Sequence, residues 1–282
     1  MRHVLALAAF ASFAAPAFAQ DGGLDAVPDA ETVVPGDIVT IGVGAAYGPD
    51  YEGSDDYRFL PGAFLRADVG GIGIVTRGLY LYADVVPDGD GKIGVDAGPI
   101  AGLRFSRTRQ VDDPLVDALP DRKTGIEVGG FAGVSVKGLT NPYDKLSFRL
   151  DALTDVNGAW DGWNFGPDIT FATPLSRKTF ASASVGIDIV SDDFARTYFA
   201  VSPEEHALVP ALPVYDLDGG VKSWDVGLLV AQAVTGDLLG GFQLFANANY
   251  KKLLGDFADS PLVAERGSAS QWFVAAGVGY TF

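Results

Sequence analysis

His206 is the side chain best suited to general-base chemistry, since the only other histidine lies at the third position of the chain. A catalytic histidine needs a nucleophile or an acidic partner at hydrogen-bond distance. Within the run Pro203-Glu204-Glu205-His206, nothing in the spacing singles out such a partner. We therefore predict a solvated loop histidine and no catalytic residue.

Three acidic segments could hold a divalent cation. The run from Pro87 to Lys92, PDGDGK, has the start of a calcium loop but lacks its full aspartate run and its glutamate at the twelfth position. The pairs Asp55-Asp56 and Asp192-Asp193 could bind an ion near lipopolysaccharide, although solvated acidic loops are the default reading of such pairs. We predict a turn, two acidic loops, no metal and no cofactor.

A further set of charges stands at alternate positions within apolar segments. Its members are Arg58, Arg66, Asp68, Asp96, Arg104, Arg149, Asp151, Asp168 and Asp188. In strands such positions share one face. If that face lines the lumen of a barrel, the charges either fill it with salt bridges, which we favour, or set the selectivity of a pore.

The elements that carry these charges have the period of β-strands. The last segment, 271–282, reads QWFVAAGVGYTF and alternates apolar residues with small or polar ones. Its final Tyr280 and Phe282 resemble the closing strand by which bacterial outer-membrane barrels are recognised by the barrel-assembly machinery.

We count eleven clear strands, each about ten to thirteen residues long, which matches the length needed to cross a bilayer at a tilt. One of them is 73–85, taken as a single strand. Because bacterial single-chain barrels have even strand counts, we predict twelve strands, with 194–201 as the missing one and ten as the alternative count. This order puts the turns near Gly70, Asn157 and Gly236 on the periplasmic side and makes 108–124 a long periplasmic excursion.

The N-terminal segment predicts export. Residues 1–19 have a basic start, an apolar run and an Ala17-Phe18-Ala19 cleavage site, as in a secretory signal peptide. Residues 20–36 are acidic and aperiodic and predict a flexible periplasmic lead-in. The barrel itself is expected over residues 37–282.

Composition excludes several classes of function. A formal net charge of −16 repels nucleic-acid phosphate and argues against DNA or RNA as a partner. The absence of cysteine removes disulfides and thiolate chemistry. Since no segment beyond the signal peptide approaches the roughly 18–20 apolar residues of a spanning helix, a membrane location requires a barrel.

Alternation alone fits both a membrane barrel and a soluble, lipocalin-like barrel. The recurrent Gly, Ser, Asn, Asp and Arg on the polar face, and the aromatic residues at strand ends, favour the membrane barrel. We therefore predict a transmembrane antiparallel all-β barrel in the outer membrane of a Gram-negative bacterium, in contact with lipid and lipopolysaccharide.

Three loop motifs resemble those of the MipA/OmpV family of outer-membrane proteins. They are the P-x-Y-x-G-S-x-x-Y opening at 49–57, the segment TYFAVS at 197–202, with Ala200 where the family usually has glycine, and the segment LGDFADSPLV at 254–263. The motif residues are Pro49, Tyr51, Gly53, Ser54, Tyr198, Phe199, Ser202, Gly255, Asp256, Asp259, Ser260 and Pro261.

The resemblance implies an outer-membrane barrel that acts as a scaffold joining a lytic murein transglycosylase to a murein synthase. We expect this non-enzymatic docking role, with 108–124 and the acidic lead-in as the contact sites. A small-solute channel is the alternative, and an outer-membrane hydrolase that depends on His206 is a third hypothesis.

Overall fold

The computed structural model describes residues 37–87 and 91–282, which form one closed antiparallel barrel. Its strands are β1 (Ile38–Pro49), β2 (Tyr57–Val69), β3 (Ile72–Arg77), β4 (Tyr80–Asp84), β5 (Ile93–Arg104), β6 (Gly125–Lys137), β7 (Lys145–Asp155), β8 (Asn164–Pro174), β9 (Thr179–Val190), β10 (Gly220–Ala233), β11 (Gly241–Leu253) and β12 (Ser270–Thr281). The predicted signal peptide and lead-in, and residues 88–90 of the predicted turn at 87–92, lie outside the described residues.

The alternation places apolar side chains on the outside of the barrel and polar ones inside. In β1, for example, Ile41 and Val43 are exposed while Thr40 and Gly42, which alternate with them, are buried. A soluble barrel would have the opposite arrangement, because water would then face the outside. The predicted membrane-type barrel is therefore confirmed.

The barrel closes between its first and last strands, which pair from Thr40↔Thr281 to Tyr47↔Val274. The hydroxyl groups of Thr40 and Thr281 also share a hydrogen bond of 2.8 Å inside the barrel. Closure removes the two terminal edges, which could not face lipid unpaired.

The predicted count of twelve strands is right, but two of the segments assigned to strands were wrong. Segment 73–85 is two strands, since Gly78, with φ of +54°, turns the chain back from β3 into β4. Segment 194–201 contains no strand: most of it belongs to helix α2 (Asp192–Phe199), which begins at an N-cap on Ser191 with two acidic residues in its first turn. Ten, the alternative count, is also wrong.

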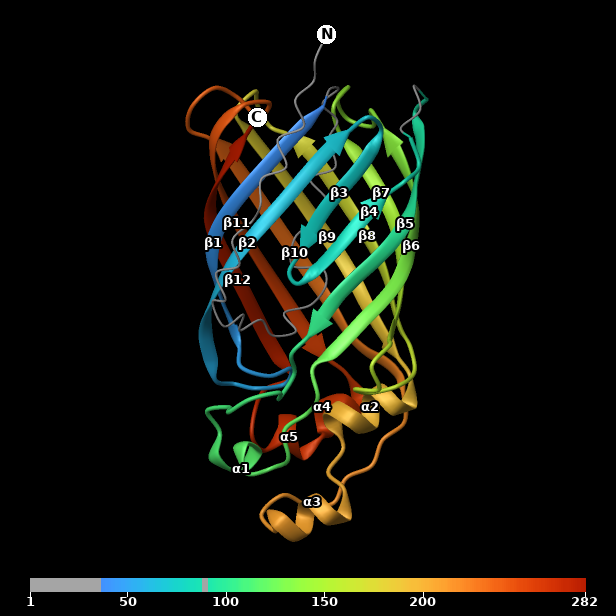
Figure 1. Ribbon diagram of the computed structural model, residues 1–282, viewed down its shortest axis with the longest axis vertical. Helices are drawn as coiled ribbons and strands as arrows, with labels where there is room; N and C mark the ends of the chain where they lie inside the picture. Colours follow the sequence, from blue (N-terminus) through green and yellow to red (C-terminus); the bar gives the residue numbers. More distant parts are fainter. Residues whose placement is uncertain (1–36, 88–90) are drawn as a thin grey trace.

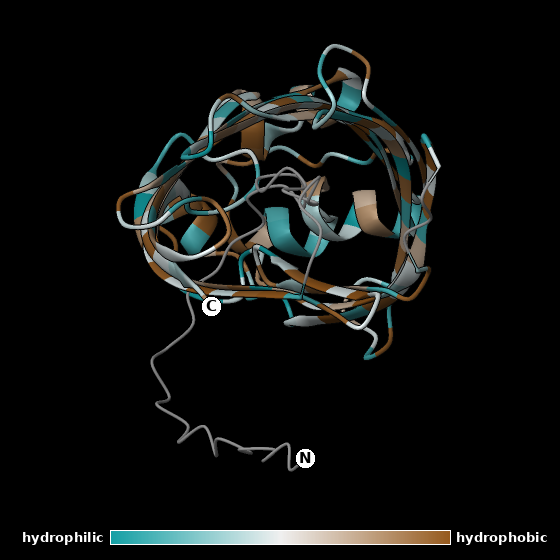
Figure 2. Cartoon of the chain, turned by 90° about the horizontal axis from the view of Figure 1, so that it is seen from above, coloured by the Kyte–Doolittle hydropathy of each residue, from teal (hydrophilic) through white to brown (hydrophobic). Residues whose placement is uncertain are grey.

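The two ends of the barrel differ (Figure 1). At one end lie the N- and C-terminal ends of the barrel and the short connections, among them the turns at Gly70 and Gly236. At the other lie five helices, α1 (Pro114–Asp117), α2, α3 (Pro203–Leu208), α4 (Gly255–Asp259) and α5 (Pro261–Ala264), which together cross the ring of strands (Figure 2). Among the described residues no helix is both long enough and apolar enough to span a membrane.

The extra turn in 73–85 corrects the position of two other connections. With β3 and β4 separate, the loop at Asn157 and the long segment 108–124 both lie at the helical end. The predicted excursion of 108–124 to the end that carries the termini is therefore wrong, and all the long loops share one end.

Candidate functional site

The helices and long loops at one end pack into a single unit, which we call the cap and define as residues 48–56, 105–124, 156–163, 191–219 and 254–269. Two buried apolar clusters hold it together, and both draw on three or more of these loops. All three family motifs lie in the cap, apart from Tyr57, which begins β2.

Tyr51 fastens the first loop to the last one. Its buried hydroxyl donates to the carbonyl oxygens of Leu262 and Arg266, each at 3.0 Å. Burial, with the nearby Asp113 and Asp50 carboxylates, raises the pKa of Tyr51 above its ordinary value of 10.0. In the same loop Gly53, with φ of +103°, and Ser54, bridged to Gly267, bring the backbone of the two loops together.

Asp113 secures the segment 105–124 within the cap. Its carboxylate accepts from the backbone N–H groups of Leu115 and Val116 at the start of α1 and pairs with Arg266. Burial alone would raise the pKa of Asp113, but the hydrogen bonds from Arg266 and from these N–H groups lower it.

The other two motifs meet through Ser260. Its buried hydroxyl donates to the carbonyl oxygen of Phe199 at 2.6 Å and also accepts from the N–H of Leu262 at the start of α5. Ser202 caps α3 in a reciprocal arrangement with Glu205. The motif residues thus hold loops together.

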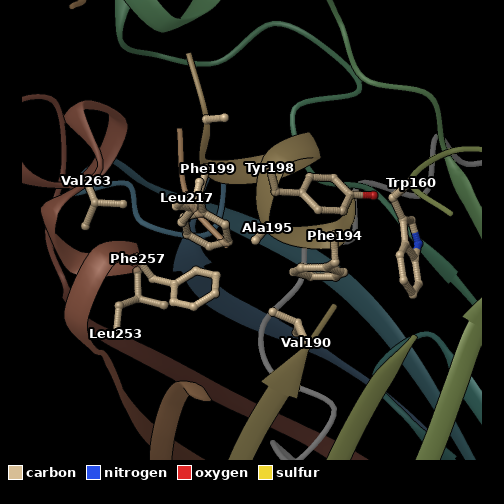
Figure 3. Packing of buried hydrophobic residues seen from close by; sticks show 11 residues of the cluster. Trp160, Val190, Phe194, Ala195, Tyr198, Phe199, Leu217, Leu253, Phe257 and Val263 are labelled. Carbon is tan, nitrogen blue, oxygen red and sulfur yellow. The ribbon is translucent and has the colours of Figure 1, made fainter. Parts of the chain in front are cut away.

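Helix α2 lies across the mouth of the barrel on an aromatic core. Figure 3 shows Trp160, Phe194 and Tyr198 on one side of this core, and Phe199, Phe257 and Leu217 on the other. Phe194 is fully buried, and its ring lies 4.9 Å from the Arg104 guanidinium and 5.0 Å from the Lys222 ammonium. We call the loop 191–219, which carries α2, the plug. The plug is therefore fixed to cations that reach Phe194 from the barrel wall.

The first of these cations belongs to a network centred on Glu127. Arg104 pairs with this buried carboxylate, Tyr80 donates to it at 2.8 Å, and the indole N–H of Trp160 donates to it at 3.0 Å. Since Trp160 comes from the cap, the network joins the cap to β4, β5 and β6.

Lys222 belongs to a second network. Its ammonium lies 2.8 Å from Glu52 of the cap and 3.4 Å from Asp188. Lys251 pairs with the same Asp188 at 2.7 Å, and the Ser223 hydroxyl donates to it at 2.9 Å. All five side chains are almost completely buried.

A third network lies further into the lumen. Arg149 pairs with Asp151 at 2.8 Å and approaches Asp168 at 3.9 Å, while Tyr82 donates to Asp151 at 2.8 Å. Nearer the terminal end, Lys145 and Asp96 form a longer pair at 3.5 Å. In this half of the barrel the charges fill the lumen as neutralised pairs.

The remaining predicted lumenal charges lie outside these three networks. Arg58 is at the rim of the cap, where it pairs with Asp50 at 2.8 Å. Arg66 pairs with Asp68 at 2.8 Å on the inward face of β2, near the end of the lumen that carries the termini. His206 lies in α3, with its ring nitrogen 2.6 Å from the carbonyl oxygen of Leu212. Within the described residues no group of three or more acidic or histidine side chains is arranged to hold a metal ion.

Sequence reasoning missed the cationic partners Lys222 and Lys251. Lys251 continues the inward face of β11 after Asn247 and Asn249, so alternation could have found it. Lys222 has the same parity as the outward Trp224, but a bulge between Val221 and Ser223 turns it into the lumen. No sequence pattern predicts that bulge.

Comparison with known proteins gives one family. Residues 41–282 match the model of the family described as MltA-interacting protein MipA. No curated protein matches the chain.

Among solved structures, an outer membrane channel from Pseudomonas putida F1 is similar at 13% identity, with 91% of this chain and 99% of that chain covered and a TM-score of 0.47. In vitro folded OmpT, an outer membrane protein of Vibrio cholerae, is similar at 10% identity, with 90% and 100% covered and a TM-score of 0.37.

Proposed function

The chain belongs to the MipA family, and we propose that it is a non-enzymatic docking barrel that binds a murein transglycosylase of the MltA type, with a murein synthase as a second partner. The family's description, MltA-interacting protein MipA, supports the first partner. The fold and the family support an outer-membrane location.

The orientation follows from the lengths of the connections. Outer-membrane barrels keep short turns in the periplasm and long loops outside. By this rule the cap faces the exterior, and the termini face the periplasm. A periplasmic enzyme cannot then reach 108–124, so we propose a docking surface on the periplasmic rim instead.

The β6–β7 turn, residues 138–144, is the observation that carries this assignment. Asp144 accepts hydrogen bonds from the N–H groups of Leu139, Thr140 and Asn141, at 2.6, 2.6 and 3.0 Å. Burial would raise the pKa of Asp144, but these bonds and the one from the Thr140 hydroxyl lower it to about 2. The carboxylate therefore stays ionised and holds the turn in one conformation.

This fixed turn presents apolar side chains to the periplasm. Leu139 is 52% exposed and Tyr143 58% exposed. Beside them lies a shallow concavity lined by Gly91, Lys92, Lys137 and residues 138–142. A rigid patch with apolar and aromatic anchors and a cationic border suits an acidic or amphipathic protein surface, because little ordering entropy is lost on binding.

The test is a pull-down of purified MltA by the barrel in detergent. The double variant Leu139→Asp with Tyr143→Asp should lose binding, while Val214→Asp, which alters an exposed apolar residue of the cap, should keep it. Heat-modifiable gel mobility checks that each variant is folded. Equal binding by both variants would remove the β6–β7 turn as the docking surface, and no binding by the wild type would remove the docking function.

A small-solute channel is the second candidate, supported by the charged side chains that line the lumen. Planar-bilayer recording separates the two functions. Ion conductance by the folded wild-type protein, with no binding of MltA, would favour the channel.

A further inference from the structure

The barrel wall has a gap on one side of β2. One edge of β2 pairs with β1 from Tyr57 to Asp68. The opposite edge pairs with β3 only from Arg66 to Val69. The β3–β4 hairpin turns back at Gly78, about halfway along the barrel, while β2 and β5 continue toward the cap (Figure 1). About 20 Å of β2 therefore has no neighbouring strand, at roughly 3.3 Å per residue.

The backbone groups that face this gap are those of the odd-numbered residues of β2. In a two-residue hairpin the residues flanking the turn bond to each other, so Val69 faces β3, and alternate residues before it do the same. At two of these positions the edge is already blunted. Pro61 has no N–H, and the Thr76 hydroxyl accepts from the N–H of Leu65 at 2.9 Å.

Blunting of this kind opposes the addition of another strand. The capped Leu65 lies where the ladder with β3 would otherwise continue, and Pro61 interrupts the row of donors beyond it. Strand pairing along this edge of β2 therefore stops at Leu65, and the gap is a feature of the barrel wall.

The gap also has borders on its other sides. Toward the cap, Arg58 donates to the carbonyl oxygen of Gln110 at 3.3 Å, and the N–H of Asp112 donates to Asp50 at 2.6 Å, so the segment 105–124 crosses from β5 to β2. We name the space between these borders the β2 window. It is enclosed by residues 59–65 of β2, the hairpin tip at 78–79 and the end of β5.

The lumen behind the β2 window differs from the charged half. Inward-facing residues of β6 to β10 are mostly buried, but Gly62 on β2 is exposed, and a Cβ atom placed there would meet nothing within 4 Å. Nearby inward-facing positions are half-buried: Gly44, Ala46, Phe64, Phe245, Ala275 and Gly277. The accessible part of the lumen beside the window is therefore mostly apolar, and the Arg66–Asp68 pair lies on the same face of β2 nearer the terminal end.

Two aromatic rings form the floor of this apolar half. Phe64 and Phe245 meet edge to face at 4.5 Å between ring centres. They rest on the backbones of β1 and β12, because a Cβ at Gly42 would lie 1.8 Å from Phe64, and one at Gly277 would lie 2.3 Å from Phe245. Paired charges from β5 to β9, together with Lys251 near the cap end of β11, line the rest of the lumen.

We propose that the β2 window admits small amphipathic molecules from the outer leaflet of the membrane into the apolar half of the lumen. The apolar body of such a molecule would lie on Phe64 and Phe245, with its polar group toward the charged half. An unpaired strand edge is not tolerated against lipid but is tolerated where it lines a hydrated opening. The cap closes the direct route through the mouth, which leaves a route through the wall.

Photo-cross-linking tests the proposal in liposomes that contain the full-length protein and a fatty acid with a diazirine in its chain. Mass spectrometry should find cross-links on lumenal Phe64 and Phe245, and also on outward Leu244 as an internal reference. Gly62→Trp should abolish the lumenal cross-links and keep the reference. Gly166→Trp, an equal addition at a roomy lumen-facing glycine of β8, should keep all of them.

Absence of lumenal cross-links in the wild type, or their persistence in Gly62→Trp, would overturn the proposal. A second measurement needs no bulky residue, since the chain has no cysteine. A fluorophore on Gly62→Cys should be quenched both by iodide and by spin-labelled lipid, whereas one on Gly166→Cys should respond to iodide alone. Identical quenching at both sites, or cross-linking of Gly62→Cys between two copies of the chain, would instead show a closed or covered edge.

Discussion

Two tyrosine hydroxyls join loops of the cap that are far apart in the sequence. Tyr51 reaches the loop 254–269 from the first loop, and Tyr215 donates to the carbonyl oxygen of Asp256 at 2.7 Å. Burial raises the pKa of Tyr215 as well, with Asp256 and Asp259 adding to the shift. Both hydroxyls can donate only while protonated.

These pKa shifts predict that the cap loosens in alkali. A group whose pKa is higher in the folded state contributes stability that is complete below its unfolded value, here about 10, and is lost as the pH rises above it. We expect proteolysis of the cap to accelerate above about pH 10. In the variant Tyr51→Phe with Tyr215→Phe, cleavage should be faster at neutral pH, and the tyrosine-dependent part of the alkaline increase should vanish.

The matched control is Tyr143→Phe, because Tyr143 is exposed and lies at the opposite end of the barrel. It should reproduce the wild-type profile, including any contribution from lysine titration. The same alkaline increase in the double variant would show that these hydroxyls do not hold the cap closed.

At most inward positions, simple alternation was enough to predict which side chains face the lumen. Asp96, Arg149, Asp151, Asp168 and Asp188 all lie there because a strand has a period of two. Which charge pairs with which could not be predicted, since the pairing depends on strand register and, at Lys222, on a bulge.

Among the elements, α2 was the hardest to predict from sequence. Its segment FARTYFAV is rich in aromatic and β-branched residues, which favour strands. Three features of the sequence indicated a helix: the N-cap residue Ser191, the acidic first turn, and the four-residue spacing of Phe194 and Tyr198. Counting α2 as a strand added one strand, and counting β3 and β4 as a single strand removed one. The two errors cancelled, so the predicted total of twelve was right.

Phe194 is the residue on which α2 most depends. Phe194→Ala removes a fully buried ring, its contacts with Trp160 and Tyr198, and two cation contacts. We expect a local loss of roughly 3–5 kcal/mol and faster hydrogen exchange at 192–199, with the strands still protected. Leu208→Ala, at an exposed position of α3, is the control and should leave exchange in α2 unchanged. Unchanged exchange in Phe194→Ala would mean that the other loops of the cap hold α2 in place.

Considered as a whole, the molecule is a barrel with one closed end, and its closure can be tested by removing the plug. The loop 191–219 returns almost to its starting point, since the N–H of Gly219 donates to Asp192 at 2.7 Å. Deleting 193–217 should therefore let β9 and β10 join in a short hairpin with little strain. The rest of the strand ladder does not involve these residues.

We expect this deletion variant to fold, to show heat-modifiable mobility and to carry a larger steady ion current than the wild type. Removing Phe194 also frees Arg104 and Lys222 from the plug, although Glu127 and Asp188 still neutralise them. Replacing only 203–208 with Gly and Ser, which removes α3 and spares α2, should not produce the current. If the larger deletion folds and yet carries no current, the buried charge pairs close the lumen by themselves, because pairs such as Lys251 with Asp188 remain without the plug. In that case the direct route through the mouth would be closed with or without the plug, and the β2 window would be the remaining route into the lumen.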